Sequence, residues 1–168
     1  MRKPMRLSTV AVFMILAGCA ALGTAWWTQH KLGIMPCELC LWERWPWRVL
    51  IALGVMAPLL PTRLGRSVLW LCAPVLLVAE GLALCHAGVE WKWWPSPLPA
   101  CHAAHVVGRT LAERWASMPL VPSKPCDAPT YLLPGVPVSM AVMGALFALF
   151  MLVVLCAGMV LSKKTRRF

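Results

Sequence analysis

Four long apolar runs, separated by shorter polar segments, dominate the pattern along this chain. Each run holds about 20 residues or more, which is enough for a helix to cross a hydrocarbon core roughly 30 Å thick. Trp26 and Trp27 close the first run as an aromatic pair of the kind that lies at a membrane surface. The pattern predicts four membrane-spanning helices, at residues 7–27, 41–60, 67–87 and 136–161.

The segment 88–134 breaks this pattern and is the long loop of the chain. It holds more than half of the 15 prolines, the cluster Trp91-Lys92-Trp93-Trp94, and two cysteines, Cys101 and Cys126. Within it, the apolar spacing over His102 to Trp115 predicts a short helix lying on the membrane surface. A loop of this length in a small protein is more often functional than idle.

Composition agrees with a membrane protein. Hydrophobic residues make up 60% of the chain, charged residues only 13%, and the mean hydropathy is +0.72. We therefore expect one integral membrane domain, residues 1–168, of the all-α class: a bundle of four antiparallel helices embedded in the lipid bilayer. The net charge of +10 does not indicate nucleic-acid binding, because the basic residues are dispersed between apolar runs.

The basic residues predict the orientation in the membrane. The amino terminus, the link Thr62 to Arg66 and the carboxyl tail carry three, two and four Lys or Arg, nine together, and no acid. By the positive-inside rule these three segments are cytoplasmic. The connection Thr28 to Pro36 and the long loop then lie on the outer side of the membrane.

The first run has an alternative interpretation as a secretory signal. Leu16-Ala17-Gly18-Cys19 resembles a bacterial lipoprotein processing site, with Cys19 as the lipidated residue. The apolar character continues past Cys19 to the tryptophan pair, beyond a usual signal segment. This continuation favours an uncleaved helix.

The predicted topology divides the eight cysteines into two sets. Four lie inside predicted spans and behave as small apolar residues: Cys19, Cys72, Cys85 and Cys156. The other four, Cys37, Cys40, Cys101 and Cys126, all lie on the outer side, where disulfides persist.

Three uses of the four outer cysteines compete. They can form structural disulfides, but a Cys-x-x-Cys bridge closes too small a ring to stabilise much. They can bind zinc, although only one Cys-x-x-Cys is present and Cys101 and Cys126 are widely spaced, so we expect no metal. They can also exchange two disulfides in series, from a soluble dithiol through one pair to the other. The last interpretation needs an electron acceptor at the bilayer edge, which indicates a lipid-soluble quinone.

Arg44 is the candidate quinone-binding side chain. It lies one helical turn beyond Cys40, on the same face and at headgroup depth. Its fixed positive charge favours a Cys40 thiolate and negative charge on a reducing quinone. Anchoring to lipid headgroups is the alternative role.

Together these motifs resemble the bacterial disulfide bond formation protein B (DsbB) family over essentially the whole chain. The matching residues are Pro36-Cys37-x-x-Cys40-x-x-Glu43-Arg44, Trp94-Pro95-Ser96-Pro97, Pro99-Ala100-Cys101 and Pro125-Cys126-Asp127.

The resemblance implies a membrane disulfide oxidoreductase that reoxidises a periplasmic DsbA-like thioredoxin-fold thiol oxidase. Cys101 would form the mixed disulfide with that partner, and Cys126 would then pair transiently with Cys37. The resting redox disulfides would be Cys37–Cys40 and Cys101–Cys126. Cys40 would pass the electrons to ubiquinone or menaquinone, with Arg44 beside the quinone ring.

Two other classes of protein stay open at this point. One is a non-enzymatic membrane protein whose outer loops are merely stapled. The other is a vitamin K epoxide reductase-like enzyme, which typically places its Cys-x-x-Cys late in the chain rather than after the first span.

Some ionisable residues also stand out. Glu80, inside a predicted span, is either functional or a neutral carboxyl bonded to a neighbouring helix. His86, His102 and His105 are more typical of solvated or interfacial histidines than of a proton relay.

Overall fold

The computed structural model describes residues 7–98, 101, 108–117, 124–132 and 135–164. These residues form helices and no β-strand, apart from an isolated bridge between Tyr131 and Ser139, so the all-α class is confirmed. The described helices are α1 (Leu7–His30), α2 (Glu38–Leu59), α3 (Thr62–Glu90), α4 (Leu111–Ala116) and α5 (Met140–Lys164).

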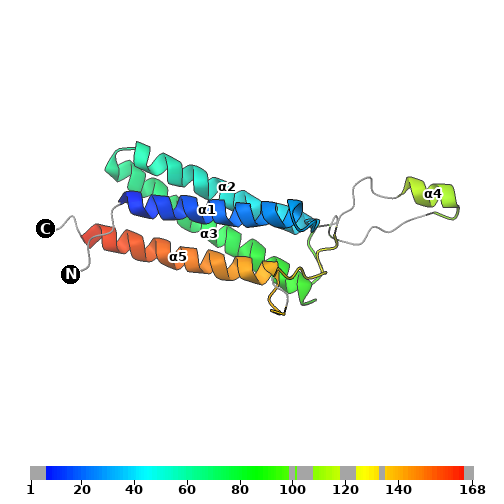
Figure 1. Cartoon of the computed structure of the whole chain (residues 1–168). Helices are drawn as coiled ribbons and strands as arrows, with labels where there is room; N and C mark the ends of the chain where they lie inside the picture. The colour runs from blue at the N-terminus through cyan, green and yellow to red at the C-terminus, as the bar shows by residue number, and fades with distance from the viewer. Residues whose placement is uncertain (1–6, 99–100, 102–107, 118–123, 133–134, 165–168) are drawn as a thin grey trace.

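The four long helices lie side by side in an antiparallel arrangement (Figure 1). Helix α2 packs against α1 and α3, and α5 packs against α3 and α1. The start of α1, the link between α2 and α3, and the end of α5 lie together at one end of the bundle (Figure 1). We call the opposite end, which carries Cys37, Cys40, Cys101 and Cys126, the cysteine end.

Three of the described helices are long and apolar enough to cross a membrane: α1, α3 and the Met140–Ser162 part of α5. This matches three of the four predicted spans. Helix α2 is long enough to cross a membrane, but it is not among these three helices, and its first half carries the charged residues Glu38, Glu43, Arg44 and Arg48. The fourth predicted span, 41–60, therefore stays a prediction.

Apolar side chains from all four long helices form the interior of the bundle. Fully buried members include Met14 of α1, Leu50 of α2, Leu69 and Leu76 of α3, and Leu155 of α5. Burying each such side chain contributes roughly 1.5–3 kcal/mol in water. Within a bilayer, close packing of these side chains provides the stabilisation instead.

The link between α2 and α3 is shorter than predicted. We expected a connection over Thr62 to Arg66, but α3 already begins at Thr62, so this prediction is wrong. Pro61 takes the N-cap position, where a missing N–H costs no helical hydrogen bond. Arg66 then points to the last turns of α5 and donates to the Met159 carbonyl (2.6 Å) and to Ser162 Oγ (3.2 Å).

The predicted surface helix over 102–115 is only partly correct. Helix α4 begins at Leu111 because Thr110 caps it, in a capping box with Glu113, and Gly108 before it has a positive φ of 150°. Residues 102–107 lie outside the described residues. All side chains of α4 are exposed, and Figure 1 shows the helix beyond the cysteine end, away from the long helices.

Gly65 allows the close approach of α3 to the end of α2. A Cβ at this position would overlap the backbone oxygen of Ala57, which cannot move aside as a flexible side chain could. We expect Gly65→Ala to lower the free energy of unfolding by about 1–3 kcal/mol. Thermal unfolding in detergent, followed by tryptophan fluorescence, measures this change.

Gly81→Ala is the matched control on the same helix. Nothing lies within 4 Å of a Cβ there, and alanine favours a helix over glycine by up to about 1 kcal/mol. Equal melting temperatures for the two variants would contradict the close approach at Gly65.

Candidate active site

The Cys-x-x-Cys pair lies at the start of α2. Cys37 is the N-cap residue, and its Sγ accepts a hydrogen bond from the backbone N–H of Cys40 at 3.3 Å. Both residues are thiols, with their sulfur atoms 2.7 Å apart. The helix start therefore holds the pair in a geometry from which a disulfide can form without backbone movement.

His86, in the last turns of α3, joins this pair to Glu43. Its Nδ1 lies 2.8 Å from Glu43 Oε1, and its Nε2 lies 3.4 Å from Cys37 Sγ. The imidazole is buried, so the interpretation of His86 as a solvated histidine is wrong. Because a carboxylate only accepts hydrogen bonds, Nδ1 carries the hydrogen and Nε2 is left to face the sulfur.

Glu90 follows His86 by one helical turn and faces the same imidazole. Its Oε1 lies 3.9 Å from His86 Nε2, and its side chain is only 2% exposed. Its Oε2 is buried and has no hydrogen-bond partner. A buried carboxylate oxygen without a hydrogen-bond partner is costly.

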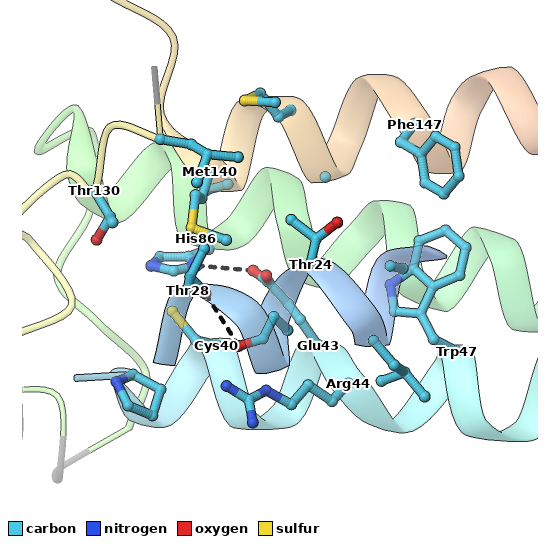
Figure 2. A pocket seen from close by; sticks show the side chains of 18 of the residues that line it. Thr24, Thr28, Cys40, Glu43, Arg44, Trp47, His86, Thr130, Met140 and Phe147 are labelled. Atoms are coloured by element: carbon cyan, nitrogen blue, oxygen red, sulfur yellow. Dashed lines mark hydrogen bonds and ion pairs between the residues drawn. The ribbon is translucent and has the colours of Figure 1, made fainter. Parts of the chain in front are cut away.

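A pocket of about 560 Å³ opens beside the cysteine pair, between α1, α2, α3 and α5. Figure 2 shows Cys40, Glu43 and His86 at one side of it and Trp47 and Phe147 at the other. The rings of Trp47 and Phe147 lie 5.3 Å apart between centroids. Most of the lining is apolar, which is typical of a site for a small apolar molecule held by few polar groups.

Arg44 also lines this pocket, as the sequence predicts. Its Nη1 donates to Gln29 Oε1 of α1 at 3.0 Å. Its Nε is buried and has no hydrogen-bond partner. The guanidinium thus keeps a buried Nε–H donor without an acceptor in a residue that lines the pocket.

The second cysteine pair forms a disulfide in the structure. Cys101 and Cys126 are joined with an S–S distance of 2.07 Å, and the Cys126 N–H donates to the Cys101 carbonyl at 3.2 Å. Both are buried in one small apolar cluster with Cys37, Leu39 and Val89. The fold therefore brings all four predicted redox cysteines together, although 61 positions separate Cys40 from Cys101 in the sequence.

Other candidates lie elsewhere. Glu80 does not line the pocket; it precedes His86 by six residues, about 9 Å along α3, and its Oε2 is buried without a partner. His102 and His105 lie outside the described residues. Sequence reasoning missed Glu43 and Glu90 as site residues, although the i, i+4 spacing of His86 and Glu90 at a span end was a usable signal.

The pKa of the Cys37 thiol lies below its ordinary value. The main cause is the hydrogen bond from the Cys40 thiol, helped by the backbone N–H of Cys40, while burial and the Glu43 carboxylate act in the opposite direction. The start of a helix also favours a thiolate, because its free backbone N–H groups and the positive end of the helix dipole stabilise a negative charge. A thiol with a lowered pKa is also a better leaving group in thiol–disulfide exchange than an ordinary cysteine.

These features define a helical membrane protein that gathers two cysteine pairs at one end beside an apolar pocket. The family described as Disulfide bond formation protein DsbB matches residues 7–158, so the chain belongs to the DsbB family. Family membership implies disulfide oxidoreductase activity, and it disfavours both the stapled-loop and the vitamin K epoxide reductase-like alternatives.

Relatives with the name Disulfide bond formation protein B agree with this assignment. The chain is 24% identical to the protein of Haemophilus influenzae (strain 86-028NP), over 92% of this chain and 90% of the relative. It is 28% identical to that of Escherichia coli O1:K1 / APEC, over 79% and 75%. It is 35% identical to that of Escherichia coli (strain K12), over 46% and 44%. No solved structure matches the chain.

The pKa of Cys37 can be tested through Cys40. In Cys40→Ala the hydrogen bond from the thiol is lost, so we expect the pKa of Cys37 to rise and its alkylation by iodoacetamide to need a higher pH. Peptide mass spectrometry of the reduced protein across pH measures the labelling of Cys37 alone. Cys85→Ala, which removes a thiol outside the site, should leave the profile unchanged. An unshifted profile in Cys40→Ala would refute the stated cause.

Proposed function

We propose that this protein reoxidises a periplasmic DsbA-like thioredoxin-fold thiol oxidase and passes the electrons through two disulfides to a membrane quinone. One observation carries the proposal. The Cys101–Cys126 disulfide and Cys37 share one buried cluster, while Cys40 lines the apolar pocket. This arrangement supports a path for the electrons from the loop disulfide Cys101–Cys126, through the pair Cys37 and Cys40, to the pocket.

The first half of the reaction takes place at the loop disulfide. A thiolate of the partner attacks Cys101, the S–S bond to Cys126 breaks, and Cys126 leaves as a thiolate. The second partner thiol then releases the oxidised partner. Two electrons now reside on Cys101 and Cys126, and the partner holds a new disulfide.

The second half transfers these electrons to Cys37 and Cys40, which we call the inner pair. Cys126 attacks the Cys37–Cys40 disulfide at Cys37, and Cys40 leaves as a thiolate. Cys101 then closes on Cys126 and releases Cys37. The shared apolar cluster supports this step because it keeps the sulfur atoms close and excludes water from the exchange.

The pocket fits a quinone. Its volume is in the range of small-molecule sites, its lining is mostly apolar, and the buried Arg44 Nε lacks an acceptor that a quinone oxygen would provide. A quinone bound there accepts two electrons and two protons, which balances the oxidation of Cys37 and Cys40 to a disulfide. Ubiquinone and menaquinone both meet this requirement.

Arg44, His86 and Glu43 have distinct roles in this scheme. Arg44 lines the pocket with a fixed positive charge and a buried Nε–H without an acceptor, and it stabilises negative charge on the quinone as it is reduced. His86 Nε2, 3.4 Å from Cys37 Sγ, takes the proton of that thiol. Glu43, hydrogen-bonded to Nδ1, orients the imidazole and stabilises its protonated form.

The proposal includes the orientation in the bilayer. With α2 as the fourth span, the cysteine end faces the periplasm, and both termini and the α2–α3 link face the cytoplasm of the bacterial inner membrane. The positions of Arg63 and Arg66 at the opposite end of the bundle from the cysteines support this orientation.

The relay predicts that each of its four cysteines is required. In detergent, with a reduced thioredoxin-fold oxidase as donor and a quinone as acceptor, the wild-type protein should reduce quinone. Single serine variants of Cys37, Cys40, Cys101 and Cys126 should lose this turnover, because each breaks one exchange step. Cys85→Ser is the matched control and should keep it. One active variant among the four would break the two-pair scheme.

The role of Arg44 predicts a difference between two arginines of α2. Arg44→Ala should raise the KM for quinone by about 10- to 100-fold, the loss expected for a charge-assisted hydrogen bond worth ~1.5–3 kcal/mol. Arg48 does not line the pocket and lies over the ring of Trp45, so Arg48→Ala should change the KM little. Steady-state quinone reduction compares the two, and equal effects would remove Arg44 from the quinone site.

A further inference from the structure

We propose that the reduced protein binds one Zn²⁺ ion through Cys37, Cys40, His86 and Glu90. The four side chains come from two facing helix ends, a Cys-x-x-Cys at the start of α2 and a His-x-x-x-Glu at the end of α3. The two sulfur atoms and the His86 ring nitrogen lie within 4.8 Å of one another. This set differs from a four-cysteine site, because His86 and Glu90 rather than Cys101 and Cys126 complete it.

The distances among Cys37, Cys40 and His86 suit a tetrahedral site after small movements. A sulfur and a nitrogen bound to one zinc lie about 3.5 Å apart, and Cys37 Sγ and His86 Nε2 are at 3.4 Å. Two bound sulfurs lie about 3.8 Å apart, so the cysteine pair must open by about 1 Å from 2.7 Å. Glu90 Oε1 lies 3.9 Å from Nε2 but outside the group of ligand atoms within 4.8 Å of one another, so the Glu90 side chain must turn toward the sulfurs to become the fourth ligand.

The buried charge at this position independently indicates a cation. Glu43 and Glu90 flank a single imidazole, and His86 is their only ion-pair partner among the described residues. Glu90 has a 2% exposed side chain and an oxygen without a partner. A divalent ion at the centre of these groups satisfies the carboxylate that the protein leaves unpaired.

The surroundings of His86 are those of a metal ligand. A ligating histidine commonly donates its other ring N–H to a carboxylate, which fixes the tautomer and increases the basicity of the ligating nitrogen. Glu43 accepts this hydrogen bond at 2.8 Å, so Nε2 is the ring nitrogen that faces the sulfurs. Two thiolates and an imidazole favour zinc over magnesium or calcium. Cys40 and His86 line the pocket, which gives the ion a path of entry.

Zinc and the inner disulfide exclude each other. Binding converts two thiols to two zinc-bound thiolates and releases two protons, without any transfer of electrons. A Cys37–Cys40 disulfide has no thiolate to offer, so the site exists only in the reduced protein. If the proposed relay operates, which this one consequence assumes, zinc holds the inner pair reduced and stops turnover until a chelator removes it.

The test compares two redox forms of the same full-length protein in detergent. Protein reduced and freed of reductant under argon is dialysed against Zn²⁺, and against Co²⁺ as a spectroscopic probe, beside protein oxidised with diamide. We expect one metal ion per reduced chain, with a thiolate-to-cobalt charge-transfer band, and at least 100-fold weaker binding by the oxidised chain. Equal binding by the two forms, or cobalt without that band, would overturn the site.

Variants with matched controls identify the ligands. Cys37→Ala and His86→Ala should bind zinc at least 100-fold more weakly, whereas Cys85→Ala and His30→Ala, outside the site, should bind as the wild type does. Glu90→Gln should weaken binding about 10-fold or more, and Glu38→Gln should not. Glu43 holds His86 Nδ1 and does not bind the ion itself, so Glu43→Gln should weaken zinc binding about 10- to 100-fold. Unchanged affinity in Glu90→Gln would remove Glu90 from the site.

The outcomes for zinc and for the relay are separable. Quinone turnover with no zinc bound by the reduced protein would refute the metal site alone. Zinc binding by a protein without turnover would refute the relay and keep the metal site.

Discussion

The hydrogen bond between Glu43 and His86 is the contact on which the cysteine end depends. It joins α2 to α3 across 43 positions of sequence and buries an imidazole beside the reactive cysteine. With Nδ1 held by the carboxylate, the other ring nitrogen has one direction left, toward Cys37 and Glu90. This one orientation places His86 in the wall of the pocket, and both of its proposed roles, proton acceptor for Cys37 and metal ligand, depend on it.

Three buried side-chain polar atoms of the described residues have no hydrogen-bond partner, and two of them, Arg44 Nε and Glu90 Oε2, belong to residues near the cysteine end. Arg44 lines the pocket, whereas Glu90 faces the His86 imidazole from the end of α3. A buried donor calls for an acceptor and a buried carboxylate for a cation, because each otherwise bears the full cost of its desolvation. The two atoms thus point to two different ligands rather than to one.

Much of this architecture could be predicted from sequence. The apolar runs predict α1, α3 and α5 because a span needs an unbroken stretch of apolar side chains, and the cysteines between those runs fall at one end of the bundle. The Cys-x-x-Cys and Arg44 are one turn apart on a single helix, so local spacing is sufficient to place them together.

Contacts between distant segments could not be predicted in this way. The burial of His86 depends on how α2 packs against α3, and nothing in the residues near His86 specifies Glu43 as its partner. Arg66 marked a polar connection in the sequence, yet the helix includes it because α5 supplies a carbonyl and a hydroxyl for its guanidinium. Long-range pairs of this kind decide where a charged residue can lie.

The burial of the loop disulfide has a consequence for selectivity. Cys101 is 3% exposed and Cys126 is fully buried, with Leu98, Leu39 and Val89 in the same cluster. A thiolate must approach a disulfide in line with its S–S bond, so a small thiol that merely diffuses past finds no sulfur to attack. Only a partner with enough contact surface to displace the covering side chains gains access. If the proposed relay operates, this burial slows the reduction of the loop disulfide by small thiols and keeps the disulfide available for the partner.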